Sequence, residues 1–172
     1  MARVTPIAVP QGSLLAGFSG PGDYSDCFCA EAAREVTLGE FIEGFYSSMA
    51  FLPERVVLGL MGRGAPRSDI QALARGETDR IAVWKVVERT DTPSSGAAAG
   101  HQTSEILLES KGTGTASWLC VSSSGEPAGG QTRLLFGSWV GNLEQSVWRS
   151  MLWPHIWYSR TLLASALKSL SQ

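Results

Sequence analysis

The stretch from Gln131 to Leu170 constrains the fold of this chain more than any other. It joins a strand-like segment at 132–141, TRLLFGSWVG, to a longer segment at 144–170, EQSVWRSMLWPHIWYSRTLLASALKSL. Six apolar residues of the longer segment recur at steps of three, four and seven, the period of one helix face: Trp148, Leu152, Ile156, Leu163, Leu167 and Leu170. A helix with so long an apolar stripe needs a large apolar surface, which the rest of the chain is expected to supply.

Pro154 interrupts this helical pattern and leaves two interpretations. Proline lacks an amide donor and disfavours helix at the residue before it, here Trp153. The segment is then either one helix kinked near Ser150 to Pro154, or a short helix followed by a second that begins at Pro154. The apolar stripe keeps its phase across the proline, which favours one continuous, kinked helix.

The preceding residues predict an early strand, two helices and further strands. The strand DYSDCFCAEA starts at Asp23, with Tyr24, Asp26 and Phe28 on one side. A capping-box pattern at 37–40 opens a helix from Leu38 to Ala50, and Pro53 opens a second. Three more strand segments follow, IAVWKVVERT, QTSEILLESK and TASWLCVSS, the last two joined by a Gly-containing turn.

Strands joined by short Gly-rich loops pair antiparallel, and helices gathered on one face define an α+β layout. The sequence therefore predicts a curved antiparallel sheet that grips the long C-terminal helix, with two shorter helices after the first strand. Residues 1–22 hold three prolines and four glycines, so they are predicted to form a flexible N-terminal arm. Residues 23–172 are predicted to form a single domain.

Composition excludes several classes of function. The net charge of −2 argues against binding nucleic acid or an anionic lipid surface. No uninterrupted apolar window approaches the roughly 18 residues that a membrane span needs, so no membrane insertion is expected. The three cysteines, an odd number without secretory features, indicate reduced thiols and a cytoplasmic location.

Several motifs resemble the START-like helix-grip superfamily, which includes the polyketide cyclases and is also called SRPBCC. The motifs are DYSDCF, VWKVVER, SEILLES with TASWLCV, and PHIWYSRTLLASAL, spread over residues 22–170. The closer resemblance is to one of its uncharacterised bacterial families, a domain of unknown function. The sequence departs in showing about five strands where larger members have more. The resemblance implies a ligand pocket between the curved sheet and the long helix.

Five residues are candidates for that pocket. Trp118, Trp139 and Trp157 are the tryptophans expected to border a cavity, and the others are assigned to the core. His155 matches a position where the suspected family also carries a histidine. It would bond a ligand or move protons, with Tyr158 beside it. The simpler interpretation is that His155 bonds a free carbonyl at the proline kink.

Neither a metal site nor a cofactor site is predicted. Cys27 and Cys29 share one strand face, but the C-x-C spacing lacks the turn of a zinc knuckle, so buried reduced thiols are the default interpretation with Cys120. Glu105 and Glu109 also share a strand face. They would serve either as an acid and base pair or as a solvated outer face.

Three functional hypotheses follow. The first is non-enzymatic binding of a hydrophobic small molecule between the sheet and the long helix. The second is a cyclase or dehydratase type of enzyme that uses His155 in the same pocket. The third is a structural or regulatory protein that forms a homodimer through exposed apolar faces of the tail helix.

Overall fold

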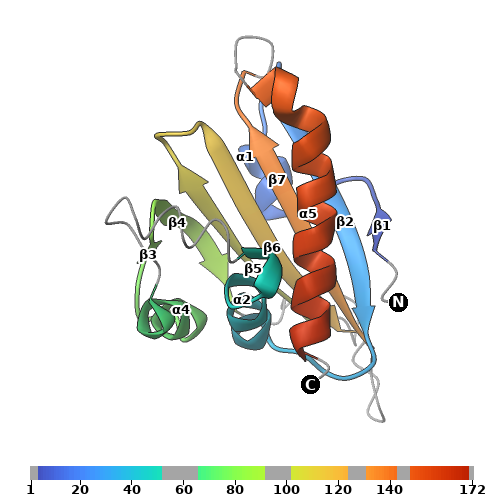
Figure 1. The fold of residues 1–172 in the computed structure, drawn as a ribbon, viewed down its shortest axis with the longest axis vertical. Coiled ribbons are helices and arrows are strands. Elements are labelled where there is room, and N and C mark those ends of the chain that lie inside the picture. The colour runs from blue at the N-terminus through green and yellow to red at the C-terminus, as the bar shows by residue number, and fades with distance from the viewer. Residues whose placement is uncertain (1–3, 52–65, 92–101, 124–130, 143–147, 171–172) are drawn as a thin grey trace.

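A long C-terminal helix, α5 (Trp148–Leu170), lies along one face of a seven-stranded antiparallel sheet (Figure 1). The computed structural model describes residues 4–51, 66–91, 102–123, 131–142 and 148–170. The strand order is β1-β2-β7-β6-β5-β4-β3, with every neighbouring pair antiparallel. The predicted α+β class, a curved antiparallel sheet gripping the C-terminal helix, is confirmed.

The remaining elements are short helices and strands of two to nine residues. The strands are β1 (Thr5–Pro6), β2 (Tyr24–Ala32), β3 (Arg80–Ile81), β4 (Trp84–Thr90), β5 (Gln102–Ser110), β6 (Thr115–Ser123) and β7 (Thr132–Val140). The other helices are α1 (Leu14–Phe18), α2 (Leu38–Tyr46), the 3₁₀ helix η1 (Met49–Phe51) and α4 (Arg67–Ala74). The second predicted helix, opened by Pro53, falls outside the described residues.

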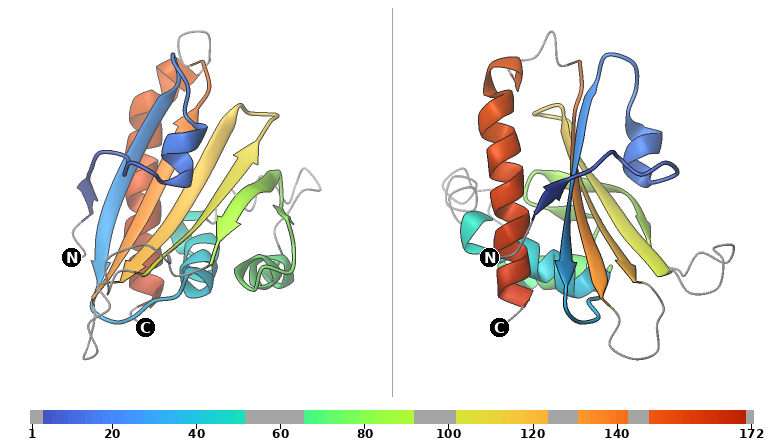
Figure 2. Two further views of the ribbon diagram at one scale, coloured as in Figure 1. Left: turned by 180° about the vertical axis from the view of Figure 1, so that it is seen from behind. Right: turned by 90° about the vertical axis from the view of Figure 1, so that its right-hand side faces the viewer.

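Buried side chains lie on both faces of the sheet, because α2, α4 and α5 lie on the front and α1 covers part of the back (Figure 2). The front face packs against α2, α4 and α5, and Phe28, Leu134 and Phe136 belong to its core. The back face packs against α1 and the chain leading to it, around Leu15 and Trp118. Strand β7 is apolar on both sides for this reason, and alternation alone does not reveal which of its sides faces α5.

Helix α5 runs without interruption through Pro154, so this segment is one continuous helix and not two separate helices. Its C-terminal half supplies the most deeply buried residues, among them Leu163, Ala166 and Leu167. Ile156 and Leu170 of the predicted stripe are partly buried against the same core. The stripe therefore identified the side of α5 that packs on the sheet.

Residues 4–22, for which the sequence predicts a flexible arm, contain β1 and α1 and contact the sheet. β1 pairs with the edge of β2, and the Ile7 amide donates to the Cys27 carbonyl at 2.9 Å. Leu15 of α1 has 0% of its surface exposed. The Ser13 hydroxyl caps α1 by accepting from the Ala16 amide. Gly12, Pro21 and Gly22 lie in turns that flank α1, whereas Pro6 lies within β1 and Gly17 within α1.

Two short edge strands explain why the structure has seven strands and the sequence predicts about five. β1 and β3 contain two residues each, too few for an alternating pattern. The predicted strand at 81–90 is divided, because Ala82 adopts a φ of 52° in a tight turn between β3 and β4.

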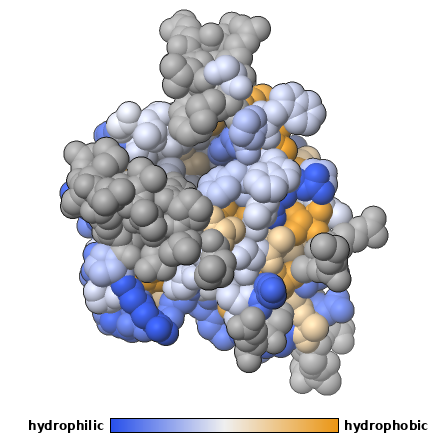
Figure 3. Space-filling model, in the orientation of Figure 1, coloured by the Kyte–Doolittle hydropathy of each residue, from blue (hydrophilic) through white to orange (hydrophobic). Residues whose placement is uncertain are grey.

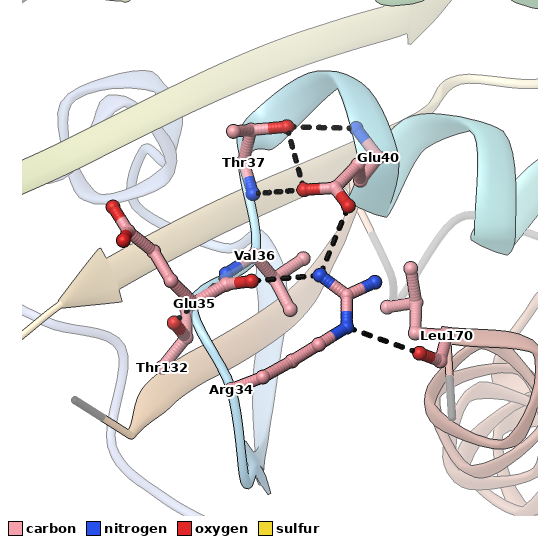
Figure 4. A network of polar contacts seen from close by, with 7 residues as sticks. All are labelled: Arg34, Glu35, Val36, Thr37, Glu40, Thr132 and Leu170. Carbon is pink, nitrogen blue, oxygen red and sulfur yellow. Dashed lines mark hydrogen bonds and ion pairs between the residues drawn. The ribbon is translucent and has the colours of Figure 1, made fainter. Parts of the chain in front are cut away.

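The predicted capping box at the start of α2 is present (Figure 4). The Glu40 amide donates to the Thr37 hydroxyl at 3.2 Å, and the Thr37 amide donates to the Glu40 carboxylate at 2.8 Å. Arg34 extends the network by donating to Glu40 and to the carbonyl of Leu170 at the end of α5. This network ties the start of α2 to the end of α5.

Thr37→Ala is expected to lower the free energy of unfolding by about 1 kcal/mol, because the first turn of α2 loses its side-chain acceptor. Urea denaturation measures the change. Thr37→Ser is the matched control, since it keeps the hydroxyl and should stay near the wild type. Equal stability of the alanine and serine variants would contradict a stabilising role for the cap.

Candidate functional site

A polar cluster interrupts the apolar front face where the N-terminal half of α5 crosses β2 and β7. In the sheet, Asp26 lies opposite Ser138, and Ser138 lies opposite Ser117. The row two residues further along is apolar, with Phe28 opposite Phe136. The front face therefore changes from an apolar half beneath α2 to a polar half beneath the start of α5.

Asp26 accepts hydrogen bonds through both carboxylate oxygens. Oδ1 accepts from the backbone amide of Ser138 at 3.1 Å and from its hydroxyl at 2.5 Å. Oδ2 accepts from the Tyr24 hydroxyl at 3.2 Å. Burial and the neighbouring carboxylate raise the pKa of Tyr24, so its hydroxyl remains a donor at neutral pH. Three donors thus fix the carboxylate beside α5.

His155 joins this cluster from α5. Its Nε2 lies 2.8 Å from the Ser138 hydroxyl oxygen. Because the serine proton points to Asp26, Nε2 must carry a proton and donate it to the serine oxygen. The result is a chain from imidazole through hydroxyl to carboxylate. In the neutral ring this tautomer makes Nδ1 the acceptor nitrogen.

Burial lowers the pKa of His155 below its ordinary value of 6.5, and the Asp26 carboxylate opposes part of this shift. The unfolded chain therefore binds a proton at a higher pH than the folded chain. Stability contributed by the neutral imidazole is present above about pH 6.5 and is lost as the pH falls toward the folded-state pKa.

We expect the free energy of unfolding to decrease as the pH is lowered from about 7.5 to about 5.5. His155→Gln should show a smaller decrease, because glutamine does not titrate in this range. Urea denaturation of both proteins at the two pH values measures the difference. An equal pH dependence in wild type and variant would show that the histidine has the same pKa in both states.

The order of the three side chains excludes a hydrolytic triad of the usual kind. In such a triad the histidine lies between the serine and the carboxylate and takes the serine proton. Here Ser138 lies between Asp26 and His155, and only 3% of its surface is exposed. Ser138 accepts a hydrogen bond from His155 and donates one to Asp26. It is too buried to act as an accessible nucleophile.

The five residues predicted for the pocket are dispersed. His155 belongs to the polar cluster, and Tyr158, three residues further along α5, donates to the Ala50 carbonyl at 3.4 Å. Trp118 and Trp139 lie on the back face, where they pack with the cluster around Leu15, so they face away from α5. Trp157 is 70% exposed on the outer side of α5.

The back-face tryptophans are held by carboxylates. Trp118 Nε1 donates to Glu105 at 2.7 Å, and the same carboxylate oxygen accepts from the Leu14 amide at the start of α1. Trp139 Nε1 donates to Asp23 at 3.0 Å. Glu105 therefore links α1 to the sheet through hydrogen bonds and is not simply a solvated charge on an outer face.

The three cysteines are free and buried on the back face. Burial raises the pKa of Cys27 to about 12 and also raises that of Cys120. Among the described residues, no three His, Cys, Asp or Glu side chains come together in a way that would hold a metal ion. The thiols of Cys27 and Cys120 stay protonated and behave as small apolar groups.

Among the hollows lined by described residues, two have neither Asp26, Ser138 nor His155 in their lining. The first, a groove of about 570 Å³, runs along the outer side of α5 and is also lined by Val4. The second, of about 370 Å³, lies between the N-terminus of α2 and Arg89. In Figure 3, apolar side chains reach the surface on the right of the view, where Figure 1 draws α5.

Comparison with family models, with curated proteins and with solved structures finds no match to this chain. Within the part of the chain that the structure describes, no helix combines the length and the apolarity that crossing a membrane would require.

Proposed function

We propose that this protein binds a hydrophobic small molecule between the polar half of the front face and the N-terminal half of α5. The chain formed by Asp26, Ser138 and His155 would hold the polar group of that molecule. The helix-grip arrangement and the resemblance to START-like sequences support this proposal. The observation that carries it is the hydrogen bond between Ser138 and His155, which joins the sheet to the helix through polar side chains.

The cost of burying this cluster is the physical reason for the proposal. A charged or polar group transferred into an apolar region costs several kcal/mol unless it is fully paired, and well-packed apolar residues often stabilise a core better. Phe28 and Phe136 fill the neighbouring row with aromatic rings. A carboxylate, a hydroxyl and an imidazole in the next row therefore indicate specificity for a partner with a polar group.

Native mass spectrometry of the gently purified protein tests the proposal. We expect a bound compound that is released on unfolding. Ser138→Ala should retain about tenfold less of it, because the hydroxyl that links Asp26 to His155 is removed. Ser165→Ala, which changes a hydroxyl further along α5, is the control and should retain the compound. A wild-type protein that carries no compound and does not enhance the fluorescence of an apolar dye would overturn the proposal.

A second candidate function is proton transfer to the bound molecule, as in a cyclase or dehydratase. It is favoured because His155 is hydrogen-bonded to the Ser138 hydroxyl, which is itself hydrogen-bonded to the Asp26 carboxylate. A neutral imidazole in this position is a competent general base. The compound found by mass spectrometry would then be converted by the wild type. His155→Gln should bind it and convert it at least about a hundredfold more slowly. Equal turnover by the wild type and by His155→Gln would contradict this second function and leave only ligand binding as the proposed function.

A further inference from the structure

The outer side of α5 exposes two tryptophans that the packed core does not use. Trp153 is 82% exposed and Trp157 is 70% exposed, and they lie one helical turn apart. Exposed tryptophans gathered on one surface are unusual in a monomeric protein and are typical of interaction sites. This side of α5 is separate from the polar cluster, which faces the sheet.

The groove beside these tryptophans is mainly apolar, and its lining contains a single charged residue, which is positive. Six residues of α5 and Val4 line it, and Arg160 is the one charged residue among them. The α5 residues are Trp153, Ile156, Trp157, Arg160, Thr161 and Ala164. None of the three ion pairs between described residues involves Arg160. A partner must therefore offer an apolar surface and a group that attracts a guanidinium.

These six positions form a self-complementary set. If a second copy of the helix lies antiparallel, with the two-fold axis between positions 158 and 159, each lining residue meets another lining residue. Trp153 then faces Ala164 of the second copy, a large side chain against a small one. Trp157 faces Arg160, an aromatic ring against a cation, and Ile156 faces Thr161.

We propose that α5 is the interface of a homodimer, in which this groove packs antiparallel against the same groove of a second copy. The groove supplies both the protruding and the receiving residues, as a two-fold interface requires. The stacking of Arg160 on Trp157 of the other copy supplies the group that attracts its guanidinium. Ala164 lets Trp153 of the other copy approach the helix backbone.

The exposed tryptophans would supply a large part of the area that such a dimer needs. A tryptophan side chain buries about 150–250 Å², so four that are about three-quarters exposed would contribute roughly 450–750 Å². A stable interface buries about 1,200–2,000 Å² in total. The tryptophans alone would supply a large part of the lower value, and Val4, Ile156 and Arg160 extend the surface around them.

Analytical ultracentrifugation over a wide range of protein concentration tests the proposal. We expect a reversible dimer whose dissociation constant rises about tenfold or more in Trp153→Ala and in Ala164→Trp. The double variant, with the two sizes exchanged, should recover most of the loss. Val87→Ser, which removes an exposed apolar side chain from β4, is the control and should dimerise like the wild type.

The size exchange separates a specific interface from general stickiness. If α5 associated only because it is apolar, Ala164→Trp would strengthen association, and this result would overturn the proposal. A wild-type protein that stays monomeric at every concentration would also overturn it, including a monomer that binds anionic vesicles through the same tryptophans.

Cysteine pairs test the antiparallel register directly. A mixture of Trp153→Cys and Ala164→Cys chains should form a mixed disulfide under mild oxidation, because the two positions face each other across the axis. Trp153→Cys alone should not form one with itself. The native cysteines are buried, so they should not compete in the folded protein. Rapid self-crosslinking of Trp153→Cys would indicate a parallel pair and contradict the proposed register.

Discussion

Leu15→Ala is expected to lower the free energy of unfolding by about 3–5 kcal/mol. Leu15 has no exposed surface and lies at the centre of the back-face core, against Cys27, Leu107 and Trp118. Helix α1 has five residues, far fewer than an isolated helix needs to be stable. Its place on the sheet therefore depends on tertiary contacts, of which Leu15 makes the most deeply buried, and truncation leaves a cavity that the strands beneath cannot readily close.

Urea denaturation followed by tryptophan fluorescence measures this effect, because Trp118 reports directly on the environment of α1. Leu14→Ala is the matched control, since Leu14 is a neighbouring leucine that is only partly buried against the same cluster. Its expected loss is about 1–2 kcal/mol. Equal, small losses for both leucines would show that the N-terminal residues behave as the loose arm predicted from the sequence.

The sequence does not reveal the short elements near the N-terminus, for a physical reason. Periodicity identifies an element only when several turns or several alternations are present, and α1 and β1 are shorter than that. Prolines and glycines mark turns equally well in loose and in packed segments. The burial of Leu15 comes from its contact with Gly137 and its neighbours on strands that lie later in the chain, which local composition cannot reveal.

The long helix and most strands were predictable because their patterns are long. The stripe of α5 remains in phase over its whole length, so Leu163 and Leu167 could be assigned to the core and are buried. The Thr37–Glu40 capping box also specifies its own geometry within four residues. These features depend on local spacing alone, which the sequence contains in full.

The candidate site was only partly predictable, because it depends on strand register. His155 was a candidate, and Asp26 could be placed on the same side of its strand as Phe28. Nothing in either strand shows that Asp26 pairs with Ser138, since β2 and β7 are far apart in the chain. Likewise, β6 and β7 are apolar on both sides, so alternation did not show that Trp118 and Trp139 face away from α5.

Gly137 is the residue through which the two faces of the sheet constrain each other. It lies in β7 between Cys27 of β2 and Trp118 of β6, and its backbone is directly beneath Leu15. The next residue along β7 is Ser138, which points to the opposite face and holds the polar cluster. Close approach of α1 on the back therefore fixes the backbone that positions Ser138 on the front.

Gly137→Ala is expected to cost about 2–3 kcal/mol or more, because an added methyl group has no room. Its Cβ would lie 2.9 Å from the Asp26 carbonyl oxygen and 3.0 Å from Trp118 Cε3, and would overlap the Leu15 side chain. Gly17→Ala is the control, since a Cβ there meets nothing within 4 Å. That exposed helical change should be neutral or stabilise by up to about 1 kcal/mol. Thermal and urea denaturation measure both.

The double variant Leu15→Ala with Gly137→Ala tests whether the two residues share one space. Truncation of Leu15 removes the side chain that the new methyl group would overlap, and the methyl group partly fills the cavity. The double variant should therefore lose about 1–2 kcal/mol less than the sum of the single losses. Additive losses would mean that Gly137 is required by the Asp26 carbonyl and Trp118 instead, because those two neighbours are present in both backgrounds.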